Sequence, residues 1–248
     1  MGVPALKING AVATVCLMRP EQANRLGPDD LETLLQHIQT VDRDPDIRVL
    51  ELTATGKYFC SGFDIHRLGS ERTVDFSTVV DALENCRPVS VAVLQGGVYG
   101  GATDLALACD FRLGSPNVDM FMPAARLGLH YYQSGLERYV QRLGLNAAKL
   151  LFLTAERLDA QQLLSVGYLT HLSEPDGLAQ LQQGLVKRLE SMAPIAMLGM
   201  KKHLNRIAQG KLDVQDLESD IRRAMNSEDL QEGRKAWAEK RTPVFKGR

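Results

Sequence analysis

Two glycine-rich segments carry the residues of this chain that could do chemistry. The first spans residues 58–65 (YFCSGFDI) and the second spans residues 96–102 (GGVYGGA). Each ends a β-branched apolar run and opens a helical pattern, which predicts a strand-to-helix turn with free backbone N–H groups aimed outside a sheet. Two such turns on neighbouring strands could hold one small anion between two N–H donors, which is the geometry of an oxyanion hole.

The elements that must position these turns follow from the apolar pattern. Asn9-Gly10 predicts a hairpin within residues 7–17, and a helix opened by Pro28 should bury one apolar face. Short strands are expected at residues 49–53, 89–94, 109–114 and 120–121, with a helical pattern at 65–68 and a helix at 102–108. Strands that alternate with helices predict an α/β core with largely parallel pairing.

The pattern changes near residue 176, where strand signals stop. Helices are expected at residues 178–193, 194–209, 214–225 and 228–240. We therefore expect a core over residues 1–175 and a helical region over 176–248 that packs on the core or on another subunit.

Bulk properties exclude several classes of protein. The 248 residues are 44% hydrophobic and 24% charged, which is ordinary for a soluble globular protein, and the net charge of −1 disfavours nucleic-acid binding. The four cysteines are far apart and lack metal-ligand spacing, so free thiols are expected and no metal. The first seven residues lack a signal-peptide core and no apolar run is long enough to span a membrane, so a cytoplasmic location is expected.

Several short motifs along nearly the whole chain stand in an order that resembles the crotonase superfamily, the enoyl-CoA hydratase/isomerase family. The motifs are residues 19–24 (RPEQAN), 59–65 (FCSGFDI), 100–106 (GGATDLA), 109–110 (CD), 123–129 (PAARLGL), 227–233 (SEDLQEG) and 240–243 (KRTP) with Phe245. The resemblance implies a spiral of ββα units, a C-terminal helical trimerisation region and acyl-CoA thioester substrates. It implies a homotrimer or a dimer of trimers, and no cofactor beyond the CoA of the substrate.

The resemblance also implies roles for individual residues. The N–H groups of Phe63 and Gly101 should bind the thioester oxygen and stabilise an enolate, with Asp104 and Tyr131 as further catalytic candidates. Ala23 and Arg25 should lie near the adenine. The remaining substrate-binding candidates are Ser61, Gly62, Asp64, Ile65, Gly100, Tyr132 and Phe245.

The chain departs from the hydratase pattern at both acid positions. Hydratases of the family use two glutamates, whereas this chain has Asp104 at the first position and Ala124 at the second. Some isomerases place their acid where this chain has Tyr132. Asp104 is open to two interpretations: an acid/base or water-holding group, or the acidic residue of a helix N-terminus.

Three functions remain open from the sequence. The leading hypothesis is an acyl-CoA enzyme of this family. The second is decarboxylation of a malonyl-type thioester, because Tyr131 stands where the methylmalonyl-CoA decarboxylase branch has a tyrosine and this reaction forms an enolate without proton abstraction. The third is an acyl-CoA binder without catalysis, which Ala124 would explain.

Other polar residues have plainer explanations. Asp64 fits a helix cap, and His130, Tyr131 and Tyr132 form either a polar rim of the acyl pocket or an aromatic plug. His66 could border the acyl pocket and Lys57 could meet the CoA phosphates, or both could be ordinary surface groups. Glu137 is expected to be a surface or ion-pair residue, and Lys246 could reach the CoA of a neighbouring subunit or belong to a frayed tail. A basic patch at Lys201-Lys202-His203 is too small to favour RNA binding.

Overall fold

The computed structural model describes residues 2–67, 74–174 and 176–248, so the predictions for Leu68 and Pro175 lie outside the described residues. Its main sheet has six strands in the order β1-β2-β3-β4-β6-β9. These are β1 (Ala5–Asn9), β2 (Val12–Leu17), β3 (Val49–Ala54), β4 (Val89–Leu94), β6 (Phe111–Gly114) and β9 (His171–Leu172).

The predicted hairpin and parallel pairing are confirmed. β1 and β2 pair antiparallel around Asn9-Gly10, and all the other pairings in this sheet are parallel. β4 lies inside the sheet and is buried along its whole length, as its sequence predicts, which is apolar except for Ser90.

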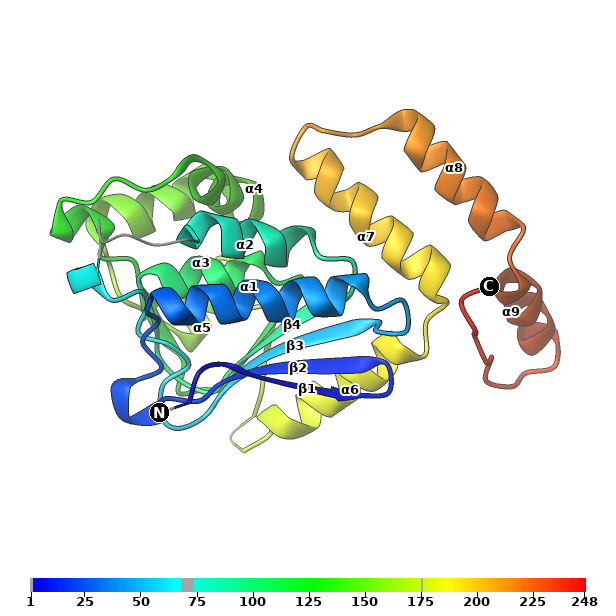
Figure 1. The fold of residues 1–248 in the computed structure, drawn as a ribbon, viewed down its shortest axis with the longest axis horizontal. Helices are drawn as coiled ribbons and strands as arrows, with labels where there is room; N and C mark the ends of the chain where they lie inside the picture. The colour runs from blue at the N-terminus through cyan, green and yellow to red at the C-terminus, as the bar shows by residue number, and fades with distance from the viewer. Residues whose placement is uncertain (1, 68–73, 175) are drawn as a thin grey trace.

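Helices cover both faces of the sheet (Figure 1). On one face lie α1 (Pro28–Arg43), α2 (Phe76–Asn85), α3 (Gly101–Ala108) and α4 (Gln133–Lys149), while α6 (Leu178–Glu190) lies on the other. α6 buries Leu185 and Leu189 against strand residues such as Val91. The short α5 (Ala160–Ser165) packs near β8 and β9.

A second, small sheet leads into the candidate site. It has the order β5-β7-β8, with β5 (Val98–Tyr99), β7 (Asp119–Phe121) and β8 (Leu158–Asp159). β5 runs directly into Gly100 and the N-terminus of α3. β7 and α3 were predicted from the sequence, whereas α2, α5, β8 and β9 were not.

The last three helices extend away from the sheet (Figure 1). They are α7 (Pro194–Ala208), α8 (Val214–Met225) and α9 (Glu228–Ala238). A buried ion pair between Lys201 of α7 and Asp110, with Nζ and Oδ2 2.7 Å apart, ties α7 to the core. No helix in the described part of the chain is long and apolar enough to cross a membrane.

The cysteines are free thiols, as predicted from their spacing. Cys60, Cys86 and Cys109 are buried, while Cys16 is half-buried. Burial raises the pKa of Cys60 to about 12, so this thiol next to the first glycine turn stays protonated and is a poor nucleophile.

Candidate active site

The two glycine-rich segments meet side by side. Cys60 and Val98 form a parallel β-bridge, and the Tyr99 N–H donates to the Cys60 carbonyl oxygen at 3.0 Å. The Phe59 N–H donates to the Gly97 carbonyl oxygen at 3.1 Å. The main chains of the two turns are therefore locked together just before each reaches its glycine.

Glycine is required where the turns come closest. Gly62 has φ +94°, and a Cβ built there would lie 2.7 Å from the Tyr99 carbonyl oxygen and 3.2 Å from the Gly101 nitrogen. A Cβ on Gly101 would lie 2.9 Å from Cζ of Phe76. Both positions therefore exclude a side chain, one because backbone blocks it and one because an aromatic ring does.

Phe63 and Gly101, the predicted anion-binding pair, border the same cavity of about 360 Å³. Gly101 is the first residue of α3, where N–H groups have no acceptor within the helix. The main chain around Phe63 is fixed by Leu26, whose N–H donates to the Gly62 carbonyl at 2.9 Å and whose carbonyl accepts from the Asp64 N–H at 2.8 Å. The structure thus brings the two residues of the prediction to one place.

Most of the predicted site residues line this cavity. They are Ser61, Gly62, Phe63, Ile65, Gly100, Gly101, Tyr131 and Tyr132. Ala124 lines it too, in the position where the two-glutamate pattern requires an acid.

Four predicted substrate-binding residues lie outside the lining. The Ala23 carbonyl accepts from the Ser61 N–H at 2.9 Å, and Nε of Arg25 lies 3.8 Å from the Asp64 carboxylate. Ala23, Arg25 and Asp64 therefore support the first turn. Asp64 also accepts from the His66 N–H at 3.1 Å, as the prediction of a cap requires. Phe245 lies among the C-terminal helices and does not reach the cavity of its own chain.

Asp104 is fully buried and does not line the cavity. Both of its oxygens lie 2.8 Å from Nη1 of Arg138, which is 1% exposed, and its Oδ2 accepts a short hydrogen bond from the Tyr132 hydroxyl. Burial raises the pKa of Asp104, while the Arg138 guanidinium and the Tyr132 hydroxyl act in the opposite direction. The carboxylate is therefore engaged by protein groups on the side that faces α4.

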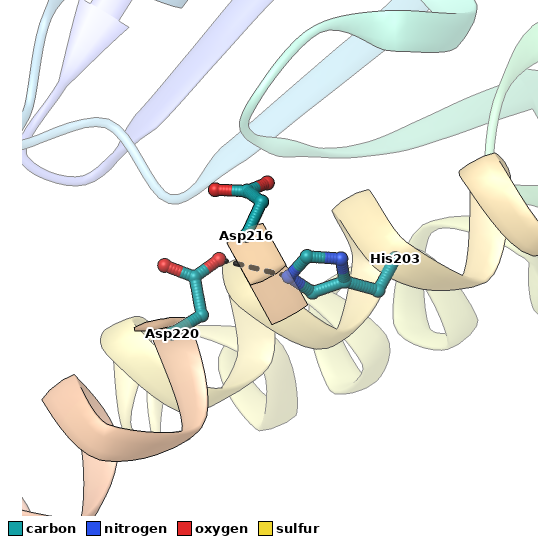
Figure 2. A group of neighbouring side chains, drawn as sticks. All are labelled: His203, Asp216 and Asp220. Atoms are coloured by element: carbon teal, nitrogen blue, oxygen red, sulfur yellow. Dashed lines mark hydrogen bonds and ion pairs between the residues drawn. The ribbon is translucent and has the colours of Figure 1, made fainter. Parts of the chain in front are cut away.

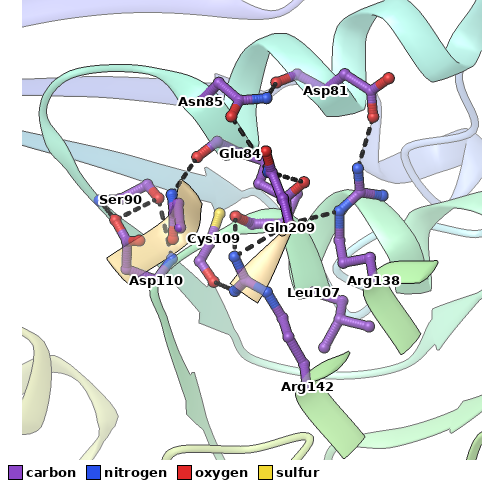
Figure 3. A network of polar contacts seen from close by, with 12 residues as sticks. Asp81, Glu84, Asn85, Ser90, Leu107, Cys109, Asp110, Arg138, Arg142 and Gln209 are labelled. Atoms are coloured by element: carbon purple, nitrogen blue, oxygen red, sulfur yellow. Dashed lines mark hydrogen bonds and ion pairs between the residues drawn. The ribbon is translucent and has the colours of Figure 1, made fainter. Parts of the chain in front are cut away.

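Arg138 extends this contact into a larger polar network (Figure 3). Its guanidinium lies 2.6 Å from the carboxylate of Asp81 and 3.0 Å from that of Glu84, both on α2. The Glu84 carboxylate also forms an ion pair with the Arg142 guanidinium at 3.3 Å. The Glu84 backbone carbonyl accepts a hydrogen bond from the side chain of Asn205 on α7 at 2.9 Å. The network joins the wall of the cavity to the C-terminal helices.

Four aromatic rings form one side of the cavity, and we call Phe63, Phe76, Tyr131 and Tyr132 the aromatic wall. Phe76 contacts Phe63 and Tyr132 edge-on, with ring centroids 6.5 and 6.2 Å apart. Tyr131 and Tyr132 stack with centroids 4.5 Å apart. Tyr131 and Tyr132 pack as aromatic rings, as the aromatic-plug interpretation expects, and both also border the cavity.

The contribution of α2 to the cavity was not predicted from the sequence. Asp75, Phe76 and Ser77 line the cavity at the start of this helix, which was not predicted. Leu127 and Leu129 also line it, although they were noted only as part of a motif. An apolar pattern at Phe76, Val79, Val80 and Leu83 could have revealed the helix but not its place beside the glycine turns.

The remaining polar candidates lie partly at the surface and partly at the cavity. Lys57 lies over the Tyr58 ring at 5.3 Å, and Glu137 is exposed and accepts from Gln133 at 2.7 Å. His130 lies at the cavity, with Nδ1 2.8 Å from the Tyr131 carbonyl oxygen.

One group of side chains has the composition of a metal site. His203, Asp216 and Asp220 place ligand atoms within 4.8 Å of one another, and Figure 2 shows His203 of α7 directed at Asp220 of α8. The Lys202 ammonium already lies 2.8 Å from Asp216 and 2.6 Å from Asp220. Burial raises the pKa of Asp220, but hydrogen bonds from Lys202 and His203 outweigh it and lower the pKa. Side-chain cations, Lys202 and Arg206, therefore already pair with these carboxylates, and the Lys201-Lys202-His203 patch has acidic partners.

Comparison with known proteins shows the family of this chain. The family model described as enoyl-CoA hydratase/isomerase matches residues 7–248. The chain belongs to this family, and it is an acyl-CoA-processing enzyme.

Several curated relatives match over nearly their whole length. The chain is 29% identical to the (E)-benzylidenesuccinyl-CoA hydratase of Thauera aromatica, over 98% of both chains. It is 28% identical to the short-chain-enoyl-CoA hydratase of Clostridium acetobutylicum, covering 95% of this chain and 94% of the relative. It is 30% identical to an enoyl-CoA isomerase/hydratase of Mycosarcoma maydis, with 94% and 91% covered.

Solved structures confirm the predicted fold class. An enoyl-CoA hydratase/carnithine racemase from Magnetospirillum magneticum superposes with a TM-score of 0.92 at 25% identity, covering 100% of this chain and 97% of the other. The enoyl-CoA hydratase from Bacillus anthracis gives 0.90 at 26% identity, with both chains fully covered. The fold is the α/β crotonase fold with a C-terminal helical region.

The Asp104–Arg138 pair should make a large contribution to stability. Asp104→Ala leaves a buried guanidinium short of one partner and is expected to lower the free energy of unfolding by about 3 kcal/mol. Arg138→Met should have a similar effect, and the double variant Asp104→Ala/Arg138→Met should lose clearly less than the sum, as measured by urea denaturation.

Asp216→Ala is a matched control, because it removes a partly exposed carboxylate from an ion pair with Arg206 and should change stability much less. Additive effects of Asp104→Ala and Arg138→Met would show that the two side chains do not act as a pair.

The two tyrosines of the wall should stay neutral at alkaline pH. Burial raises the pKa of both Tyr131 and Tyr132 well above the usual value, and the negative charge of Asp104 raises them further. Because a raised pKa keeps the hydroxyl protonated, turnover should show no tyrosine ionisation up to about pH 10. A step in the pH–rate profile below pH 9 that Tyr132→Phe abolishes would contradict this.

Proposed function

We propose that the protein converts an acyl-CoA thioester through an enolate, whose oxygen accepts hydrogen bonds from the N–H groups of Phe63 and Gly101. The observation that carries the proposal is the close approach of the two turns at one cavity, where a Cβ on Gly62 would lie only 3.2 Å from the Gly101 nitrogen. An enolate oxygen carries more charge than the thioester carbonyl, so fixed N–H dipoles stabilise it more than the substrate.

The reaction class we favour is that of the hydratases and isomerases among the relatives. Both reactions move a proton at the α- or γ-carbon of an enoyl thioester, and both need one enolate-stabilising site. In the described lining, Asp75 and His130 are the candidates for carrying this proton, because the hydroxyls of Tyr131 and Tyr132 are directed at Asp104. Asp104 is then a positioning residue. It accepts a hydrogen bond from the Tyr132 hydroxyl and so fixes the Tyr132 ring at the cavity.

The test of this proposal is a change at the contact between the turns. Gly62→Ala must move the Tyr99 carbonyl and with it Gly101, so kcat with crotonyl-CoA should fall by about 100-fold or more. The substitution should leave circular dichroism and the oligomeric state unchanged.

Gly10→Ala is the control, because Gly10 also has a positive φ (+57°) but lies in the hairpin turn with open space around it. It should lose some stability and no activity. Unchanged turnover in Gly62→Ala would contradict the proposal, and release of CO2 from methylmalonyl-CoA without hydration of crotonyl-CoA would select the decarboxylase hypothesis instead.

We also propose that three copies assemble through α7, α8 and α9. These helices line an apolar groove of about 840 Å³, and Trp237 on its edge is 88% exposed. Met200 and Leu204 of α7 are 60% and 65% exposed. An apolar surface of this kind is typical of a subunit interface, and a second copy of the chain would also place Phe245 near a neighbouring site.

Light scattering after gel filtration tests the assembly. The wild-type chain should run at three or six times the chain mass, and Leu204→Asp should shift it toward the monomer, because a charge on this surface would be buried without a partner. Arg222→Asp, on an exposed part of α8, should not change the mass. A wild-type monomer at micromolar concentration would contradict the proposed assembly.

A further inference from the structure

The acyl end of the cavity is built for an uncharged group. The described residues that line it include no Lys or Arg side chain. Among these described lining residues, a carboxylate on the acyl chain would lose water without gaining a cationic partner, which is costly. Apart from the glycine turns, the lining consists mainly of aromatic and aliphatic side chains. Met122, Leu127 and Leu129 supply aliphatic surface in addition to the aromatic wall.

The aromatic wall is held rigidly from behind. The Tyr132 hydroxyl donates to Asp104, and the Tyr131 hydroxyl lies 3.4 Å from the same carboxylate oxygen. Because Asp104 lies outside the cavity lining, both hydroxyls are directed into the protein. Phe152 packs against Tyr131 with ring centroids 5.0 Å apart. The wall therefore presents ring carbon to the cavity, in positions set before a ligand arrives.

The wall also offers the geometry in which a further ring packs well. Its neighbouring rings are tilted by 62° and 68° at Phe76 and stacked within 28° at Tyr131 and Tyr132. Aromatic rings prefer edge-to-face or offset-stacked contacts at such separations, and a saturated ring of similar size lacks this preference. Phe76 is central because it contacts Phe63 on one side and Tyr132 on the other.

We infer that the acyl group of the substrate carries an aromatic ring, as in an arylpropenoyl thioester of CoA, and that Phe76 is a main determinant of this specificity. This inference rests on the proposed function, because it takes the cavity to be the acyl site. The volume of about 360 Å³ lies in the range of small-molecule sites and accommodates a phenyl ring beyond the thioester.

Binding of saturated thioesters tests the inference without turnover. The probes are 3-phenylpropanoyl-CoA, 3-cyclohexylpropanoyl-CoA and butanoyl-CoA, measured by titration calorimetry with the full-length protein. The phenyl probe should bind about 3- to 10-fold more tightly than the cyclohexyl probe, since one or two aromatic contacts are worth that much. Butanoyl-CoA should bind more weakly than either, and succinyl-CoA most weakly.

Phe76→Leu should remove the difference between the phenyl and cyclohexyl probes, because it keeps an apolar side chain and deletes the ring. Phe111→Leu is the matched control: Phe111 lies on β6 among the residues packed by α6, outside the cavity, and its loss should leave the ratio unchanged. The wild-type ratio is informative even if Phe76→Leu fails to fold.

Equal binding of the phenyl and cyclohexyl probes by the wild-type protein would overturn the inference and leave the proposed function standing. A preference for the phenyl probe that persists in Phe76→Leu would overturn the role of Phe76. Failure of all four thioesters to bind would overturn the proposed function together with the inference.

Discussion

The close approach of two main chains at Gly62 and Gly101 is the constraint on which the site depends. It requires the bridge between Cys60 and Val98, which aligns the two turns, and the absence of a side chain at Gly62. The main sheet positions the end of β3 at this point, and the small sheet positions β5. Because backbone dipoles do not rearrange during a reaction, a site built this way is ready for the charge of an enolate before substrate binds.

The role of Asp104 depends on the side chains that contact its carboxylate. Its sequence position is that of a hydratase acid, but Arg138 and Tyr132 surround it in the fold. Two carboxylates of α2 complete the charge around Arg138, which makes the pair part of the connection between α2, α3 and α4. In the proposed function, Asp104 contributes through the aromatic wall, and another group that borders the cavity carries the proton.

Much of the core could be predicted from local patterns. The Asn9-Gly10 hairpin, the buried β4 and the turn into α3 each depend on residues adjacent in the chain. The partner of Asp104 could not be predicted, because Arg138 is 34 residues away and nothing in its own segment indicates burial. The same holds for Phe76, whose position beside Gly101 depends on how α2 packs on α3. Local sequence predicts elements, whereas contacts between distant elements require the fold.

The most direct test of the account is the carbonyl stretching frequency of a bound thioester, measured by difference infrared spectroscopy with butanoyl-CoA labelled at the carbonyl carbon. Two N–H donors from Phe63 and Gly101 polarise the carbonyl, so the band should shift to lower frequency than in water, and Gly62→Ala should reverse the shift. A band at the frequency found in water, with the ligand fully bound to the wild-type protein, would contradict the account.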